Sequence, residues 1–229
     1  MVKFNVNWYK QFIEKTNEKD LLVMKILGLL EGKPKNSCVE IGLGISPYFA
    51  EKLARLFKRY TIIEKRLFKK KMPKKVKLIP KDWEKIELKE KFDVIIASHV
   101  IYYFKNKKEA VKKMFDSLSN GGRIFFVVNG KSSDYGPLKL AFGKMVNAKY
   151  RFTYDELLKM LKNKKFKEYT LPSTMKFSSY EDLFKTLKLS FDSYPKEYEK
   201  SKNKIIDYFK ENLKGKRFII DQKIIEVVK

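Results

Sequence analysis

A turn with two glycines, placed between a strand and a helix, is the first feature of the sequence that could do chemistry. In the segment Val39–Pro47 (VEIGLGISP), an apolar strand runs through Glu40 into Gly42 and Gly44, and a helix follows. Small residues let a ligand approach the backbone, and the helix N-terminus behind them offers free N–H groups. Ser46, directly before the proline, is the predicted N-cap of that helix. The pattern predicts a ligand-binding loop.

The glycine spacing excludes two common phosphate-binding motifs. A dinucleotide fingerprint, G-x-G-x-x-G, needs its third glycine where Pro47 stands, and no Gly-Lys-Ser/Thr follows to make a P-loop. Instead, an acidic residue stands two positions before the first glycine. A carboxylate at Glu40, near the end of its strand, suits a ligand that carries a cationic amino-acid moiety.

Acidic residues also follow the next two predicted strands. Glu64 ends the second strand, where its carboxylate could accept hydrogen bonds from both hydroxyls of a ribose. After the third strand, Asp82 could bind an adenine amino group and Trp83 could cover the ring. Asp93 begins the fourth strand, so we expect a structural role for it.

Strands and helices alternate along the chain and must position these residues. The predicted strands are Cys38–Ile41, Tyr60–Glu64, Val76–Pro80, Phe92–Ala97, Arg123–Val128, Phe166–Leu171 and Ile224–Val228. The predicted helices are one around Trp8–Ile13, Leu21–Leu30 capped by Asp20, Pro47–Lys58, Lys107–Leu118 ending at Asn120-Gly121-Gly122, one opened by a capping box at Thr153–Glu156, Tyr180–Leu189 and Pro195–Leu213. This alternation predicts an α/β fold with a mostly parallel sheet and helices on both faces.

The charge leaves two interpretations open. The 229 residues include 52 Lys+Arg and 27 Asp+Glu, for a formal net charge of +25. Such a charge favours a polyanionic partner such as RNA, and the densest basic cluster is Lys65–Lys75. However, only six of the basic residues are arginine, and lysines recur between apolar positions of predicted helices, as on a solvated face. The charge alone does not decide between the two.

The rare residues exclude several classes. A single cysteine, Cys38, excludes an internal disulfide and a multi-cysteine zinc site, and a single histidine, His99, disfavours most metal hydrolases and Ser-His-Asp enzymes. No apolar run reaches the roughly 20 residues that span a bilayer, and the N-terminus lacks the apolar stretch of a signal peptide. We therefore expect a metal-free cytoplasmic protein without a membrane partner.

Taken in order, these segments resemble the class I S-adenosylmethionine-dependent methyltransferases. The resemblance covers residues 38–129: the glycine turn, the ribose acid, the adenine-site acid, the fourth strand with its following SHVIYYF, and the fifth strand after Gly121-Gly122. It implies a Rossmann-like seven-stranded sheet, S-adenosyl-L-methionine as cofactor and S-adenosyl-L-homocysteine as product. The implied cofactor-binding residues are Glu40, Gly42, Gly44, Ser46, Glu64, Asp82, Trp83 and Ser98.

The resemblance also implies one domain, residues 1–229, divided by role. Residues 1–33 would form N-terminal helices, 37–130 the cofactor-binding half, 131–214 an acceptor-side region with a helical insertion, and 217–229 the last strand. The C-terminal half, GKSSDYGPLKLAFGKM and then FTYDELLKMLKNKKFKEYTLPSTMKFSSYEDLF, resembles histamine N-methyltransferase and its relatives. This likeness implies a small-molecule acceptor that is methylated at nitrogen.

Two nucleic-acid chemistries fit poorly. Methylation of an exocyclic base amine usually comes with Asp/Asn-Pro-Pro-aromatic, where this chain has Ser98-His99-Val100-Ile101. Methylation of pyrimidine carbon 5 needs a cysteine nucleophile, and Cys38 is expected to be buried in its strand. An RNA methyltransferase of another kind, or a non-catalytic module that binds the cofactor or RNA, stays open as an alternative.

His99 and Tyr102 are the candidate catalytic residues. His99 follows the fourth strand and could act as a base if the acceptor arrives protonated, or it could be a loop histidine bonded to backbone. Tyr102 could line the acceptor pocket or pack beneath a helix. Aromatic side chains of the acceptor-side region could likewise close over an acceptor or anchor the insertion. They are Tyr135, Phe142, Tyr180, Phe184, Phe191 and Tyr194.

Overall fold

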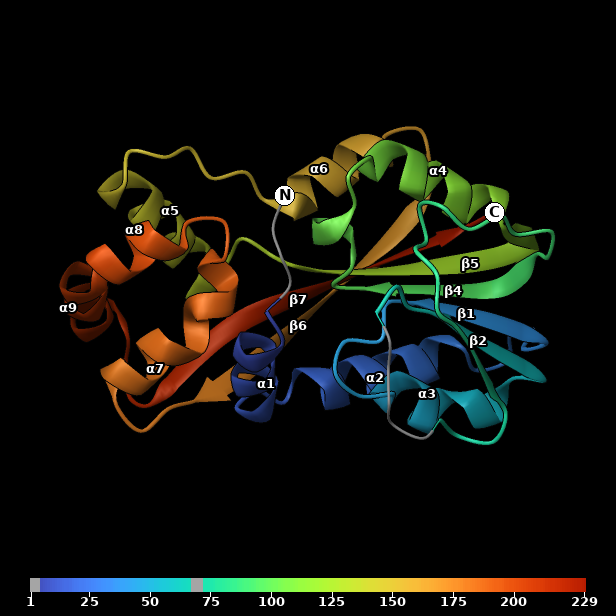
Figure 1. Ribbon diagram of the computed structural model, residues 1–229, viewed down its shortest axis with the longest axis horizontal. Coiled ribbons are helices and arrows are strands. Elements are labelled where there is room, and N and C mark those ends of the chain that lie inside the picture. The colour runs from blue at the N-terminus through green and yellow to red at the C-terminus, as the bar shows by residue number, and fades with distance from the viewer. Residues whose placement is uncertain (1–4, 67–71) are drawn as a thin grey trace.

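A sheet of seven strands runs through the centre of the structure, a computed structural model that describes residues 5–66 and 72–229 (Figure 1). The strands are β1 Ser37–Ile41, β2 Arg59–Ile63, β3 Val76–Ile79, β4 Phe92–Ser98, β5 Leu118–Asn129, β6 Phe166–Lys176 and β7 Arg217–Val228. Their order is β3-β2-β1-β4-β5-β7-β6; β1 to β5 are parallel, and β7 runs antiparallel to both its neighbours. The predicted mostly parallel seven-stranded α/β fold is confirmed.

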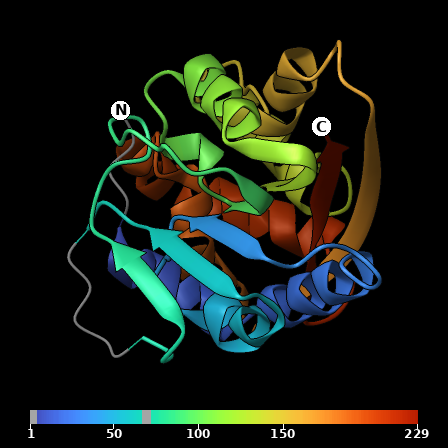
Figure 2. The same cartoon turned by 90° about the vertical axis from the view of Figure 1, so that its right-hand side faces the viewer.

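Helices cover both faces of this sheet. They are α1 Val6–Glu14, α2 Glu18–Leu29, α3 Tyr48–Leu53, α4 Lys107–Asp116, α5 Tyr135–Met145, α6 Thr153–Met160, α7 Tyr180–Thr186, α8 Pro195–Lys200 and α9 Lys202–Asn212. Figures 1 and 2 show α4 and α6 on one face and α2 and α3 on the other. The helices α5, α7, α8 and α9 gather at one end, beside the extended part of β6 and β7 (Figure 1).

The apolar strands fold this way because both of their faces are buried. In β4, Val94 and Ile96 pack on the side of α2 and α3, while Ile95 and Ala97 pack on the side of α4, and all four are at most 1% exposed. Alternate residues of a strand point to opposite faces, so a continuous apolar run is the pattern of a parallel strand between two helix layers.

A third core fills the helical insertion and is largely aromatic. The ring of Phe191 lies 4.5 Å from that of Tyr198 and 4.8 Å from that of Phe142, and Phe184 stacks on Tyr198 at 4.4 Å between ring centres. Phe142, Phe184 and Phe191 are all buried. For these three, the anchoring alternative is confirmed, because they hold the insertion together and do not form a lid.

Two predicted helix starts are wrong. Helix α2 begins at Glu18 with Asn17 as N-cap, so Asp20 is not its cap; the Asp20 carboxylate accepts a hydrogen bond from Tyr48 instead. Helix α3 begins after Pro47, and the Ser46 hydroxyl does not cap it. That hydroxyl is bound instead by the ammonium of Lys19, at 3.2 Å.

The predicted capping box is also wrong. Thr153 is the first residue of α6 and Phe152 is the N-cap residue. The Glu156 carboxylate, which should reach back to the cap, pairs with Lys107 of α4 at 2.5 Å between nitrogen and oxygen. A charge-assisted bond between helices has taken its place.

Other boundaries shift by a few residues. Strand β5 begins at Leu118, so Asn120-Gly121-Gly122 lies within the strand and does not end a helix. The predicted helix Pro47–Lys58 stops at Leu53 and continues as a 3-10 turn, Ala54–Leu56. Further 3-10 turns occupy Ile101–Tyr103 and Leu187–Phe191, within segments predicted as loop and helix.

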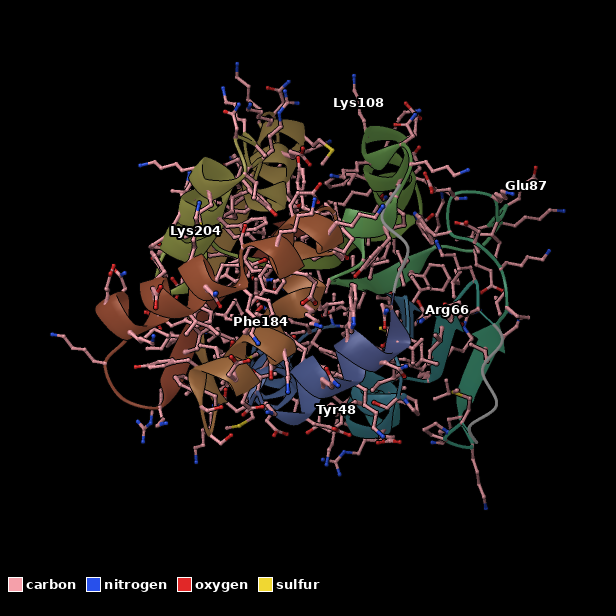
Figure 3. All side chains as sticks on the ribbon, turned by 60° about the vertical axis from the view of Figure 1, so that its left-hand side comes forward. Tyr48, Arg66, Glu87, Lys108, Phe184 and Lys204 are labelled. Atoms are coloured by element: carbon pink, nitrogen blue, oxygen red, sulfur yellow. The ribbon has the colours of Figure 1, made fainter. Side chains whose placement is uncertain are left out.

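The basic surface is spread out. Figure 3 shows long nitrogen-tipped side chains around the outline of the molecule, and the labelled Lys108 and Lys204 are both exposed. Within the predicted cluster Lys65–Lys75, residues 67–71 lie outside the described residues. In the described parts of the chain, we find no helix with the length and apolar character needed to cross a membrane.

Candidate active site

A cavity of about 870 Å³ lies at the carboxyl ends of β1, β2, β4 and β5, where open α/β sheets bind their ligands. The predicted site residues that line it are Glu40, Gly42, Gly44, Glu64, Asp82, Trp83, Ser98, His99 and Tyr102. Ser46 does not line it. The topology therefore brings nine of the ten predicted residues to one space.

The glycine turn forms the floor of this cavity. Gly42 and Gly44 have φ angles of 81° and 69°, a left-handed conformation that glycine adopts without strain. The backbone N–H of Gly42 donates to the carbonyl of Ile63 at 2.9 Å, which ties the turn to β2. A Cβ at Gly44 would lie 3.0 Å from the hydroxyl oxygen of Tyr9 on α1. The turn thus needs glycine both for its shape and for the close approach of α1.

Glu64 lies at the edge of the cavity, and several N–H groups donate hydrogen bonds to its carboxylate. Its carboxylate accepts hydrogen bonds from the backbone N–H of Leu43 at 2.9 Å and from the backbone and guanidinium of Arg66 at 2.9 to 3.1 Å. Burial raises the pKa of Glu64, but the bonds from Arg66 and Leu43 outweigh burial and hold that pKa below its ordinary value. The side chain is therefore held as an anion.

Glu40 is also buried, at 3% exposed. Burial raises its pKa to about 7, against the opposing effects of the Tyr60 hydroxyl, which donates to it at 2.8 Å, and of Lys19. A buried carboxyl without a matching cation is costly to ionise. A ligand ammonium placed beside Glu40 would supply that missing charge.

Asp82, Trp83 and Ser98 line the cavity in different ways. The Asp82 carboxylate accepts from the backbone N–H of Glu84 at 3.0 Å and stays half-buried. The Trp83 indole is 3% exposed, and its N–H donates to the carbonyl of Ala110 at 3.1 Å, which fixes the ring against α4. Ser98 is the last residue of β4.

His99 is held in an unusual backbone conformation directly after β4. Its φ of +50° is rare for a residue with a side chain, and strain of this kind is concentrated at functional sites. Its Nε2 lies 3.2 Å from a carboxylate oxygen of Glu18, although the pair is not aligned as a hydrogen bond. On the other side, Nδ1 lies 3.4 Å from the Tyr102 hydroxyl. Both ring nitrogens thus face polar groups of the protein.

Glu18 was not predicted as a site residue. It is 4% exposed, lies in the first turn of α2, lines the cavity, and accepts a hydrogen bond from the Gln222 amide at 2.9 Å. The acceptor-side part of the lining likewise includes Lys139 and Asp192, which the sequence analysis did not single out. One signal for Glu18 was available, because an acid in the first turn of a helix that leads to the glycine loop is well placed for a site.

Comparison with known families decides the class of protein. A model of the methyltransferase domain family matches residues 14–187 of the chain, which includes the whole cavity floor. The chain belongs to this family. The methyltransferase uses S-adenosylmethionine, as the acid and glycine pattern of the turn implies. Among curated proteins, an uncharacterized protein of Methanocaldococcus jannaschii is 34% identical over 79 residues; the match spans 33% of this chain and 21% of that protein.

Solved structures of methyltransferases share the fold of this methyltransferase. A candidate methyltransferase of Bacillus halodurans has a TM-score of 0.62 at 14% identity, with 90% of this chain and 98% of that chain covered. The N-methyltransferase NodS of Bradyrhizobium japonicum, in complex with S-adenosylhomocysteine, has a TM-score of 0.50 at 16% identity, with 91% and 85% covered. Coclaurine N-methyltransferase, bound to N-methylheliamine and S-adenosylhomocysteine, has a TM-score of 0.55 at 14% identity, with 92% and 70% covered.

The residues of the methyltransferase fit this cofactor. Two glycines with positive φ shape the turn that lines the cavity, and carboxylates at the ends of β1 and β2 line the same space. Glu40 lacks a full counter-charge and Glu64 is ionised. These features match the ammonium and the ribose hydroxyls of S-adenosylmethionine.

Proposed function

We propose that this methyltransferase methylates a small-molecule acceptor at nitrogen. The observation that supports the proposal is the single cavity that extends from the glycine turn to an aromatic wall supplied by residues 131–214. Its volume of about 870 Å³ is within the range of small-molecule sites, about 300–1,000 Å³. An enzyme for large RNA would need a wide, basic groove that leads to the reacting atoms.

In this proposal the cofactor-binding residues have separate roles. Glu40 binds the ammonium of the amino-acid moiety, Glu64 binds the ribose hydroxyls, and Asp82 and Trp83 lie at the adenine end. Gly42 and Gly44 let the ligand approach the backbone, and Ser98 lies next to the transferred group. Ser46 stays a predicted cofactor-binding residue, although its side chain does not line the cavity. The bound cofactor supplies an activated methyl group.

The residues of the chain then position the nitrogen and accept its proton. The amine approaches between the cofactor-binding half and the acceptor-side region, where His99 and Glu18 face one another at 3.2 Å. Because both nitrogens of His99 face protein groups, we assign proton acceptance to the Glu18–His99 pair and not to a free imidazole. Tyr102 orients the imidazole ring of His99. Its hydroxyl accepts from the backbone N–H of Asn129 at 2.7 Å, so its own proton can point to Nδ1.

Positioning and exclusion of water supply most of the rate in such an in-line transfer. NodS and coclaurine N-methyltransferase, which share the fold, are both N-methyltransferases. The resemblance of the C-terminal half to the histamine N-methyltransferase branch stays a prediction that points to the same class.

Incubation with methyl-labelled cofactor tests the proposal. The purified protein is offered a small-metabolite extract and total RNA in parallel, at physiological salt, and label is followed in each fraction. We expect label on a nitrogen of a small molecule. Glu18→Gln should lose most of this transfer, whereas Glu31→Gln, an exposed acid just after α2, should keep it.

Two results would contradict the proposal. Label that appears in RNA and not in the metabolite fraction would establish the RNA alternative. Protein that binds no S-adenosylhomocysteine and transfers no label would remove the enzymatic function altogether. Loose attraction of lysines to RNA is distinguished from specific use because it weakens steeply as salt is raised.

A further inference from the structure

Three aromatic rings surround the ammonium of Lys139. Its Nζ lies 4.4 Å from the ring centre of Phe191, 4.7 Å from that of Tyr150 and 5.4 Å from that of Tyr135. Tyr135 lies one turn earlier on α5, Tyr150 lies in the loop after α5, and Phe191 ends a 3-10 turn. Ring faces attract a cation, so packing from three segments fixes the position of this charge.

The ammonium has no anionic partner in contact. No ion pair to Lys139 is formed within the described parts of the chain. Lys139 is 8% exposed, and burial lowers its pKa to about 7 although Asp192 acts in the opposite direction from a longer distance. An apolar residue would pack in this core at lower cost. A buried lysine kept without a partner points to a ligand.

Few charged residues lie near Lys139 in the described structure, and Asp192 is the one whose charge acts on its ammonium. Among the charged residues that line this part of the cavity, Lys107 and Glu156 pair with each other at 2.5 Å. The others are Lys139, Arg151 and the single carboxylate of Asp192, whose pKa burial raises to about 6. Burial also favours the neutral form of Lys139, so an anion that binds beside its Nζ would restore the ammonium and gain its attraction.

A line of polar groups connects Lys139 to the reacting end of the cavity. The side chains of Asn129 and Ser190 lie near enough to the Tyr135 hydroxyl to lower its pKa, against the larger opposite effect of burial. Asn129 donates its backbone N–H to Tyr102, which lies against His99. The Oδ1 atom of Asn129 and the hydroxyl of Tyr150 are both buried, and neither has a hydrogen-bond partner in the described structure. These atoms are available to polar groups of a bound acceptor.

We propose that Lys139 binds an anionic group of the acceptor, so that the acceptor is an amine that carries a carboxylate or a phosphate away from the methylated nitrogen. The inference rests on the proposed nitrogen methylation and adds the class of acceptor. The ammonium forms charge-assisted hydrogen bonds with the anion, and the three rings exclude water from them. The amine end then extends past Asn129 to the Glu18–His99 pair.

Calorimetry on protein saturated with S-adenosylhomocysteine tests this without turnover. The probes are benzylamine, 4-(aminomethyl)benzoate and 4-(aminomethyl)phenylphosphonate, which share an amine and a ring and differ in the anionic group. We expect at least one anionic probe to bind about tenfold or more tightly than benzylamine. The carboxylate and phosphonate arms show which anion the site prefers. Lys139→Met should remove this preference, Lys139→Arg should keep part of it, and Lys144→Met, at an exposed position of the same helix, should leave it unchanged.

Other outcomes overturn the inference. Equal binding of all three probes to the wild type, no measurable binding of any probe, or a preference that survives Lys139→Met would each contradict it. Tighter binding of benzylamine to Lys139→Met would show that the cage accepts the ligand's cation instead. Protein that fails to bind S-adenosylhomocysteine would instead refute the proposed function, so the two failures are distinguishable. Thermal unfolding of each variant establishes that it is folded.

Discussion

Acidification should weaken cofactor binding through Glu40. Burial raises the pKa of this carboxyl from its ordinary value of 4.5 to about 7, with a partial offset from the Tyr60 hydroxyl. Below pH 7 the free protein therefore holds Glu40 mainly as the neutral acid, whereas a ligand ammonium requires the carboxylate. With this pKa, affinity should fall about fivefold from pH 7 to 6 and about tenfold from pH 6 to 5, since one pKa unit corresponds to about 1.4 kcal/mol.

Titration calorimetry with S-adenosylhomocysteine at pH 8, 7, 6 and 5 measures this slope. Repetition at pH 6 in buffers of different ionisation enthalpy counts the proton that Glu40 should release on binding. Glu40→Gln should bind more weakly at pH 8 and show little further loss on acidification. Asp192→Asn is the control. Burial raises the pKa of Asp192 to about 6, but we place this residue at the acceptor end, so the variant should keep the pH dependence of cofactor binding. A folded wild type whose affinity stays flat from pH 8 to 5 would refute the reasoning.

Three further substitutions test the site and the fold. Glu64→Ala should weaken S-adenosylhomocysteine binding by roughly 1–3 kcal/mol through the lost charge-assisted bonds, and unchanged affinity in calorimetry would contradict the ribose role. Gly44→Ala should destabilise the protein to urea by about 1–2 kcal/mol, because the residue has a φ of 69° and its Cβ would press on Tyr9; an unshifted midpoint would count against this geometry. Phe142→Ala should lower the unfolding free energy by about 3–5 kcal/mol, whereas Leu140→Ala on the same helix, 52% exposed, should change it by less than about 0.5 kcal/mol.

The sheet could be predicted from the sequence because its signals are local. A strand buried on both faces, such as β1 or β4, is a nearly continuous apolar run, whereas β3 and β6 are more exposed. Strand β6 was predicted to stop at Leu171 but continues to Lys176 through Pro172. A proline interrupts a central strand, but β6 is an edge strand whose one neighbouring strand in the described sheet is β7, so the missing N–H is tolerated there.

Helix caps were less predictable because distant residues compete for the same side chains. The hydroxyl of Ser46 and the carboxylate of Glu156 were predicted to cap helices, and each is instead bound by a lysine from another helix. In a chain with 52 Lys+Arg, many acidic and hydroxyl groups lie within reach of an ammonium. A capping motif in such a sequence has stronger competitors than its own backbone.

The candidate site likewise has one half that could be predicted from the sequence and one half that could not. Its cofactor half was predictable because each acid stands a fixed number of residues from a strand end, and parallel strands bring those ends to one edge. Its acceptor half was not, because Glu18 meets His99 and Gln222 only in the folded chain, and Lys139 is surrounded by rings from three segments. By type, Lys139 is one basic residue among 52. Burial without a counter-ion sets it apart from the exposed lysines, and that property arises only when the insertion packs. Under the proposal above, the position of this one buried lysine says more about the acceptor than the net charge of +25 does.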